Sequence, residues 1–119
     1  MPTDKTGAEV TVTHNPDEQR YEISAEGRLA GFTQYRDRPE DPDAVERVFF
    51  HTEVSDEFAG RGLATILVRE ALDATRDAGV TIVGVCPLVA AFLKKNPDYA
   101  ASTHPVTPQI LTWLKSVLP

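Results

Sequence analysis

The sequence lacks the features of several specialised protein classes. A single cysteine leaves no pair for an internal disulfide, which is typical of the reducing cytoplasm. No apolar run approaches the roughly 20 residues of a membrane-spanning helix, and the N-terminus carries no hydrophobic signal region. The net charge of −6 argues against nucleic acid as a partner, because phosphate recognition favours a basic surface. We therefore expect a cytoplasmic protein that binds neither membrane nor nucleic acid.

The composition suits one globular domain. The chain has 119 residues, of which 41% are hydrophobic and 25% are charged, enough for a modest core. We expect a single domain over residues 1–119, whose first residues, 1–8, are polar and frayed.

Three segments alternate apolar and polar residues with the period of two that predicts half-buried strands. They cover residues 9–14, 20–25 and 29–35, with turn signals at 15–18 and at Gly27. This order predicts an antiparallel meander. For the acidic, proline-rich segment 37–46 we expect a solvated loop, with a substrate-facing lip as the alternative.

A strand, a glycine loop and a helix follow, and they organise the chain. Residues 48–54 predict a central strand covered on both sides. Alternation assigns its faces: one carries Val48, Phe50, Thr52 and Val54, and the other carries Phe49, His51 and Glu53.

The helix is expected over about 61–78, ending before Gly79. Its predicted apolar stripe consists of Leu63, Ile66, Leu67, Glu70, Ala71, Ala74 and Ala78, interrupted only by the glutamate. The first amides of a helix have no partner inside it and lie at the positive end of its dipole. Because glycine lets an anion approach the backbone closely, Gly60 and Gly62 favour a phosphate-binding site there.

The remainder of the chain predicts one more strand and two helices. The apolar run 80–85 favours a strand parallel to 48–54, and Gly84 suggests a bulge or a close backbone approach. A short helix is expected over 88–95 with Pro87 in its first turn. A last helix over about 107–118 begins at a Thr107 cap, and we expect it to pack on the domain or, alternatively, to dock a partner.

The glycine loop matches neither common nucleotide motif. A P-loop requires a lysine after its last glycine, and a dinucleotide fingerprint requires a third glycine. The run Gly60-Arg61-Gly62-Leu63-Ala64-Thr65-Ile66-Leu67 instead resembles the Gln/Arg-x-x-Gly-x-Gly/Ala signature of the GNAT superfamily of acyl-CoA-dependent N-acetyltransferases. Glu57 stands where this signature has Gln or Arg, and Ala59 stands where Arg is common.

Three further pieces are similar to small single-domain members described as minimal acetyltransferases. They are His51-Thr52-Glu53-Val54, the segment from Cys86 to Phe92, and Asn96-Pro97-Asp98-Tyr99, and the resemblance spans about residues 9–99. It implies a trimmed GNAT-like α/β fold: a mixed, mostly antiparallel sheet with a parallel strand pair splayed near Gly84, and helices packed on it. Members of this superfamily usually have one or two helices before the meander, and the sequence shows no helical pattern there.

The resemblance also implies acetyl-CoA as cosubstrate, no metal, and an amine acceptor on a small molecule, protein or peptide. The chain would be a monomer or weak dimer. Pyrophosphate binding would fall to Gly60, Arg61, Gly62, Leu63, Ala64 and Thr65. The backbone at Thr52 and Val54 would hold the pantetheine arm and acyl group, and Asn96 would contact the adenosine or phosphate end.

Three side chains are candidates for the chemistry. His51 and Glu53 project together and could serve as the base; an imidazole titrates near neutral pH, whereas a carboxylate would need burial or a bridging water. The alternatives are a core or sheet-surface histidine for His51 and a cap or ion-pair partner of the loop for Glu53. Cys86 precedes a helix N-terminus, which stabilises a thiolate, but a lone cysteine can also be a small buried hydrophobe.

We expect an N-acetyltransferase in which the amine attacks acetyl-CoA directly in a ternary complex; a relay through acetylated Cys86 remains open. The tyrosine that serves as acid in other members would fall near Lys94 and is absent. The alternatives are a non-catalytic acyl-CoA-binding module and an interaction protein.

Overall fold

A computed structural model describes residues 3–4, 6–41 and 44–119. Over these residues five strands form one sheet in sequence order: β1 (Val10–Asn15), β2 (Arg20–Ala25), β3 (Arg28–Asp41), β4 (Ala44–Val54) and β5 (Thr81–Gly84). The first four pair antiparallel, and β4 pairs parallel with β5. The predicted mixed sheet with one parallel pair is confirmed.

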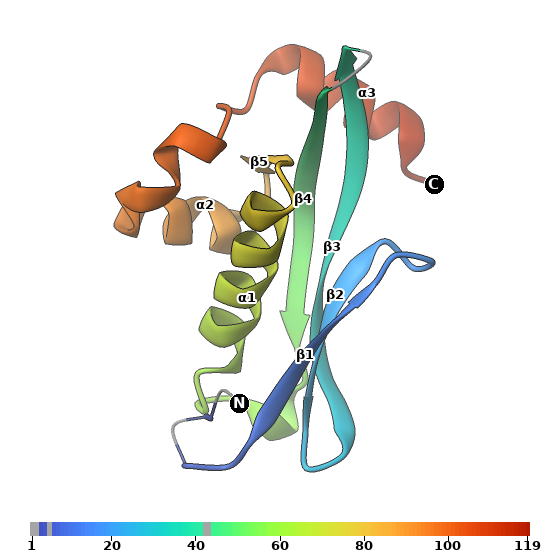
Figure 1. Cartoon of the computed structure of the whole chain (residues 1–119). Coiled ribbons are helices and arrows are strands. Elements are labelled where there is room, and N and C mark those ends of the chain that lie inside the picture. The colour runs from blue at the N-terminus through green and yellow to red at the C-terminus, as the bar shows by residue number, and fades with distance from the viewer. Residues whose placement is uncertain (1–2, 5, 42–43) are drawn as a thin grey trace.

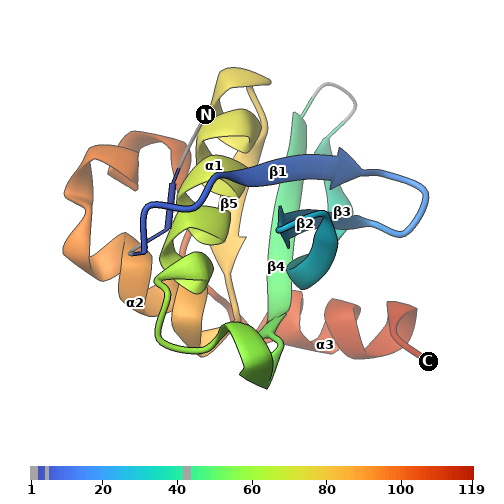
Figure 2. The same cartoon turned by 90° about the horizontal axis from the view of Figure 1, so that it is seen from below.

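The helices cover both faces of this sheet. They are α1 (Leu63–Asp77), α2 (Pro87–Lys95) and α3 (Pro108–Val117), with short 3₁₀ turns at Asp56–Phe58 and Pro97–Ser102. Figure 1 shows α1 lying along the sheet, and Figure 2 shows α3 on the opposite face. None of the helices among the described residues combines the length and the apolar character that a membrane span requires.

The sheet separates two apolar clusters. The larger one lies under α1 and α2 and includes Phe49, Leu67 and Val89, whereas the smaller one joins Val48 and Val83 to Ile110 and Leu114 of α3. The last helix therefore packs on the sheet, as expected. Its cap is confirmed as well, since the Thr107 side chain accepts a hydrogen bond from Ile110 N at 3.2 Å.

The buried stripe of α1 differs from its prediction. Val68, Leu72 and Thr75 are buried, while Ala74 and Ala78 are exposed. The buried face is thus rotated toward the larger side chains, because a methyl group at Ala74 or Ala78 removes little apolar area from water. Gly79 follows the helix with φ +74°, as predicted for the residue that ends it.

The expected loop at 37–46 is wrong, because this segment forms the end of the long β3–β4 hairpin. Asp37 pairs with Arg47 and Arg38 pairs with Glu46 across the two strands. Their side chains form ion pairs of 2.8 Å and 2.6 Å, so opposite charges stabilise pairing that the composition alone disfavours. The tip, residues 42–43, lies outside the described residues.

The predicted faces of β4 are wrong beyond Phe50, because the strand contains a bulge. Tyr35 pairs with Phe49 but Gln34 pairs with His51, so Phe50 is an extra residue. Phe49 belongs to the cluster under α1, and Phe50 packs on the cluster under α3. Beyond the bulge the alternation is reversed.

The N-terminal segment is more ordered than predicted. Thr3 bridges to Glu9, and the Asp4 side chain is buried. Asp4 accepts hydrogen bonds from the backbone N–H groups of Thr6 (2.8 Å) and Ala8 (3.1 Å). The carboxylate thus satisfies amides that would otherwise leave the segment frayed; residues 1–2 and 5 lie outside the described residues.

Candidate functional site

The glycine loop turns the chain from the end of β4 into α1. Gly60 and Gly62 have φ of +80° and +78°, a region that other residues rarely adopt. A Cβ atom on Gly60 would meet nothing within 4 Å, so this position faces open space. The loop borders a shallow pocket of about 290 Å³ lined by Val54, Phe58, Ala59, Gly60, Gly62, Leu63, Ala64 and Thr65. The structure therefore brings together most of the residues predicted to bind pyrophosphate.

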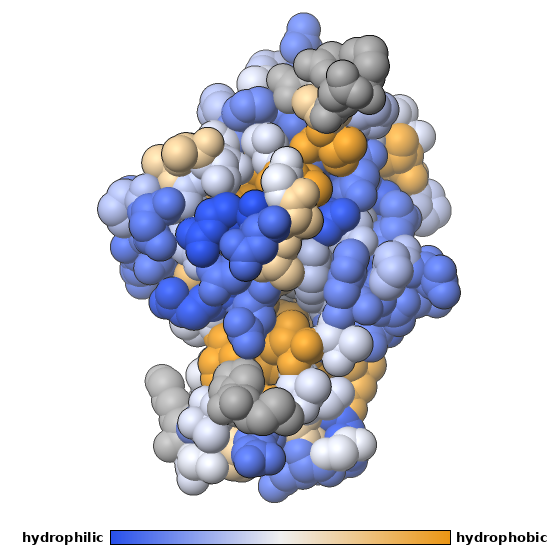
Figure 3. Space-filling view, in the orientation of Figure 1, coloured by the Kyte–Doolittle hydropathy of each residue, from blue (hydrophilic) through white to orange (hydrophobic). Residues whose placement is uncertain are grey.

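The start of α1 leaves its amides available. No side chain caps the helix among the described residues, and its N-cap is Gly62. Ile66 N donates to Gly62 O at 3.3 Å, so the amides of Leu63, Ala64 and Thr65 precede the first helical hydrogen bond. In Figure 3, apolar residues reach the surface in the lower part of the molecule, where these first turns lie, and also near its top.

The edge of β4 opens where β5 diverges. Their pairing ends at Phe49 and Gly84, and Phe49 O accepts hydrogen bonds from both Val85 N (3.0 Å) and Cys86 N (2.9 Å). A Cβ on Gly84 would lie 3.0 Å from the Leu93 side chain and 3.4 Å from Ala90 N, so α2 packs closely against this glycine.

Backbone alternation shows which amides face this open edge. Ser55 N donates to Ala30 O on β3 at 2.7 Å. Counting back from Ser55, the amides of Thr52 and Val54 point away from β3. Val54 also lines the glycine-loop pocket, so edge and pocket are continuous.

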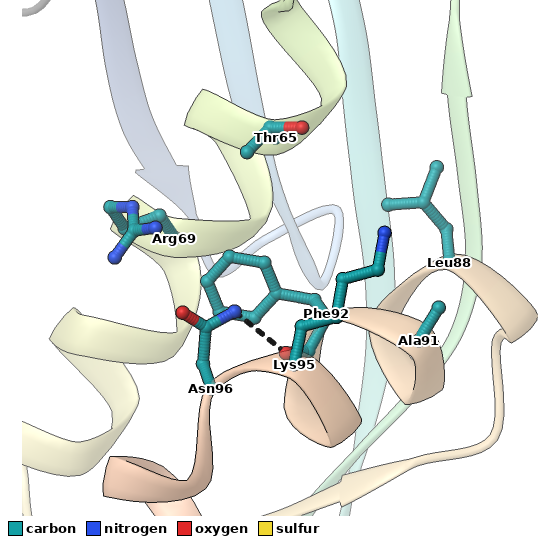
Figure 4. Close-up of a pocket in the computed structure, with 7 residues that line it drawn as sticks. All are labelled: Thr65, Arg69, Leu88, Ala91, Phe92, Lys95 and Asn96. Atoms are coloured by element: carbon teal, nitrogen blue, oxygen red, sulfur yellow. Dashed lines mark hydrogen bonds between the residues drawn. The ribbon is translucent and has the colours of Figure 1, made fainter.

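A second pocket of about 280 Å³ separates α1 from α2 (Figure 4). It is lined by Thr65, Arg69, Leu88, Ala91, Phe92, Lys95 and Asn96. Arg69 lies over the Phe92 ring at 5.1 Å, and Asn96 Nδ2 donates to Phe92 O at 2.8 Å. Because Thr65 lines both pockets, Asn96 lies along the same surface as the glycine loop.

Arg69 was not among the residues predicted from the sequence to bind the cofactor. A signal was present: Arg69 follows Thr65 by four residues, and this spacing puts both on the same face of α1.

Arg61 lies beside the loop rather than in its pocket. It contacts Asp4 at 2.6 Å and Glu26 at 3.5 Å, and these carboxylates raise its pKa. Hydrogen bonds, first from Thr6 and then from Arg61, hold the pKa of Asp4 down at about 2. Arg61 and Asp4 instead line an adjoining pocket of about 320 Å³. Sequence reasoning missed Asp4, which lies 57 positions before its partner.

His51 and Glu53 are brought together as expected. His51 Nε2 lies 2.8 Å from Glu53 Oε1, and both side chains are about half exposed. The Phe32 ring lies 6.1 Å from the imidazole. The pair is thus accessible to a molecule approaching the face of the sheet opposite α1.

Cys86 does not join this pair. It is 4% exposed, and its thiol donates to Thr52 Oγ1 at 3.4 Å. Thr52 lies between His51 and Glu53 in the strand, so its side chain projects to the other face. The three candidate side chains therefore flank β4 from two sides.

Tyr99 does not replace the tyrosine missing at Lys94. It is buried against Phe92 and donates its hydroxyl to Asp73. Burial, and then the Asp73 carboxylate, raise its pKa to about 12. Within the described part of the chain, no three His, Cys, Asp or Glu side chains gather closely enough to hold a metal ion.

Comparisons with known proteins agree with this architecture. A family model described as GCN5-related N-acetyl-transferase matches residues 20–102. An NMR structure of a protein described as GCN5-like, from Staphylococcus aureus, superposes with a TM-score of 0.54 at 21% identity, covering 82% of this chain and 91% of the other. A ribosomal-protein-alanine N-acetyltransferase from Brucella melitensis gives 0.55 at 15% identity, covering 84% and 93%. None of the curated proteins matches the chain.

Proposed function

The chain belongs to the GCN5-related N-acetyltransferase family, and from this premise we propose that it moves an acetyl group from acetyl-CoA to an amine. The observation that carries the proposal is one continuous surface. It begins at the open edge of β4, where Val54 borders the glycine-loop pocket. It continues past the uncapped start of α1 and reaches the α1–α2 pocket at Thr65, which lines both pockets. An extended molecule with phosphates near one end fits such a surface.

The phosphates would bind mainly to backbone. The amides at Leu63, Ala64 and Thr65 and the dipole of α1 favour the pyrophosphate. Arg61, although predicted to help, is neutralised by Asp4, so its contribution would be smaller. Arg69, Lys95 and Asn96 in the α1–α2 pocket would take the adenosine end, whose additional phosphate suits a cation.

The open edge of β4 would position the acyl group. An amide at Thr52 or Val54 can donate to the thioester carbonyl oxygen, which gains negative charge as the amine attacks. Such a donor is fixed by the strand and needs no reorganisation. The side chains there matter less than the backbone.

The His51–Glu53 pair would act as the base on the other face of the strand. Direct transfer forms a bond from the amine nitrogen to the acetyl carbon and breaks the carbon–sulfur bond. The proton lost by the amine passes to His51 Nε2 or Glu53 Oε1, which lie 2.8 Å apart. A thiol ionises near pH ~8.5 and is a good leaving group, so the tyrosine missing at Lys94 is not required.

Cys86 contacts Thr52 from the α1 side. We place it at the acyl end without a proton-transfer role; the alternative is a relay through an acetylated thiol. We further propose a single cytoplasmic domain, monomeric or weakly dimeric, whose acceptor is a small molecule, a protein or a peptide.

The test uses two measurements on the full chain. Acetyl-CoA should raise the melting temperature, because a ligand that binds only the native state stabilises it. A panel of amines should then release free CoA thiol, measured with a thiol reagent. A thermal shift without release of CoA with any amine would support the acyl-CoA-binding module. This alternative is favoured by the lysine at position 94, where other members have the acidic tyrosine, and by the burial of Tyr99 against Asp73. No shift at all would support the interaction protein.

A further inference from the structure

The pairing of the arginines points to a feature of the acceptor. The protein has 18 acidic and 12 basic residues, so an arginine without a carboxylate is unusual. Six arginines form ion pairs: Arg20, Arg28, Arg38, Arg47, Arg61 and Arg76. In the described part of the chain, Arg36 and Arg69 have no carboxylate partner. Arg69 lies in the α1–α2 pocket, and Arg36 lies across the sheet from it.

Arg36 is fixed against the bulge of β4. Its guanidinium lies 5.2 Å from the centre of the Phe50 ring, and its Nη1 donates to Tyr35 O at 2.9 Å. Stacking on an aromatic ring orients the planar group and limits its loss of freedom on binding. Among the described residues, no other acceptor bonds to the N–H groups of this guanidinium.

Arg36 is a near neighbour of the candidate base. Gln34 pairs with His51, so Arg36 lies two residues along the adjacent strand. Strand geometry puts the backbones of Arg36 and His51 roughly 8 Å apart. Both side chains belong to the face opposite α1, since Phe50 packs on the α3 cluster and His51 on Phe32. On this face α3 packs on Val48 and Val83, and Phe50 borders the same cluster. Figure 2 shows α3 across the sheet from α1.

We propose that the acceptor is a small amine that also carries a carboxylate, as an amino acid does. The carboxylate binds the fork of Arg36, and the amino group meets the His51–Glu53 pair. This inference rests on the proposed function and specifies its substrate class. Arginine suits the role because its parallel N–H groups match the two carboxylate oxygens. A protein of net charge −6 would otherwise repel the carboxylate of such an acceptor, so a cation beside the base without a described carboxylate partner is informative.

The test compares matched acceptors. Each ω-amino acid from glycine to 6-aminohexanoate is paired with the alkylamine of the same length, and kcat/KM is measured by CoA release. The best carboxylate-bearing acceptor should exceed its alkylamine by about tenfold or more, and Arg36→Leu should bring this ratio close to one. Arg36→Gln keeps most of the side chain and should behave in the same way.

Arg20→Leu is the control. Arg20 stacks on Phe32 at 4.6 Å in the same arrangement, but its charge is paired with Glu22 at 2.7 Å. Its removal should leave the preference for carboxylates intact. If Arg20→Leu and Arg36→Leu lose the preference for carboxylates equally, any arginine removed from this face of the sheet has the same effect, and the role of Arg36 is overturned.

The outcomes separate this inference from the proposed function. If amines release CoA but carboxylates give no advantage in the unmodified protein, the acceptor class is wrong and the acetyltransferase stands. A binding measurement covers the case without turnover: N-acetylated ω-amino acids are titrated in the presence of CoA. Weaker binding to Arg36→Leu than to the unmodified protein supports the carboxylate site, and equal or absent binding to both overturns it.

Discussion

The two sides of β4 offer different chemistry. On the α1 side and along the open edge, the groups next to β4 are backbone amides, glycines and a buried thiol. Of the neighbouring cations, Arg61 is neutralised by Asp4, and Arg69 lies in the α1–α2 pocket. On the opposite face the groups are ionisable side chains: His51 and Glu53 are paired, and Arg36 has no carboxylate partner among the described residues. A strand sends successive side chains to opposite faces, so one short segment can separate cofactor binding from proton transfer. Variants on each side should therefore affect different measurements.

The largest effect is expected on the opposite face. Replacing both partners, His51→Gln and Glu53→Gln, should lower kcat by about 100-fold or more, since a positioned base contributes at least that much. The thermal shift with acetyl-CoA should not change. Glu18→Gln is the control, because Glu18 is an exposed carboxylate in the turn between β1 and β2. Loss of the thermal shift in the double variant would show that the two sides are not independent.

Gly60→Glu should weaken cofactor binding on the α1 side. The substitution strains a residue at φ +80° and places a carboxylate where the phosphates would lie, so affinity for acetyl-CoA should fall by about 100-fold. Gly79→Glu is matched in strain, at φ +74° with nothing within 4 Å of its Cβ, but it lies at the other end of α1. Calorimetric titration should give near-normal binding for Gly79→Glu. Equal losses of affinity in the two variants would refute phosphate binding at the glycine loop.

Arg69→Gln tests the binding of the additional phosphate on the same side of β4. Affinity for acetyl-CoA should fall by about tenfold, because a charge-assisted contact to the additional phosphate is lost. Affinity for the dephospho form, which lacks that phosphate, should not change. Arg76→Gln on the same helix, whose charge is already paired with Asp73, should alter neither titration. A loss that is equal for both ligands would place Arg69 elsewhere.

Asp4→Asn tests the neutralisation of Arg61. The pKa of Asp4 is held at about 2, below its ordinary value of 3.8, so its stabilising effect is present above the ordinary value and is lost as pH falls toward 2. The variant should melt a few degrees lower at neutral pH, and the difference should vanish toward about pH 2.

The same variant compares backbone with side-chain binding. If amides hold the pyrophosphate, releasing Arg61 should change acetyl-CoA affinity by less than about threefold. Clearly tighter binding would instead assign the pyrophosphate to Arg61. Glu26→Gln is the control, because Glu26 reaches the same guanidinium from an exposed position at 3.5 Å.

Cys86→Ala should have the smallest effect. The thermal shift with acetyl-CoA should remain, and with direct transfer kcat should change by no more than about threefold. Mass spectrometry of the unmodified protein after mixing with acetyl-CoA should show no acetyl-cysteine. Abolished turnover together with an acetylated thiol would establish the relay. Cys86→Ser, which preserves a donor for Thr52, separates packing from chemistry.

Local sequence signals predicted most of the elements. Gly79 ends α1, Thr107 caps α3, and Pro87 begins α2, because each of these depends on backbone preferences within one turn of helix. The glycine loop and the His51–Glu53 pair were also predicted, since glycine spacing and strand alternation are short-range patterns. Arg36 and Arg69 were not, because whether an arginine has a carboxylate partner depends on distant segments.

The sequence by itself therefore determined the order of strands and helices, the parallel crossover between β4 and β5, and the glycine loop that opens α1. The tertiary structure decided the bulge at Phe50, the long β3–β4 hairpin and the contact of Asp4 with Arg61. The physical reason is the range of the interactions. A cap or a turn is stabilised by neighbouring residues, whereas a bulge, a cross-strand ion pair or a buried carboxylate gains its free energy only from groups that folding brings together.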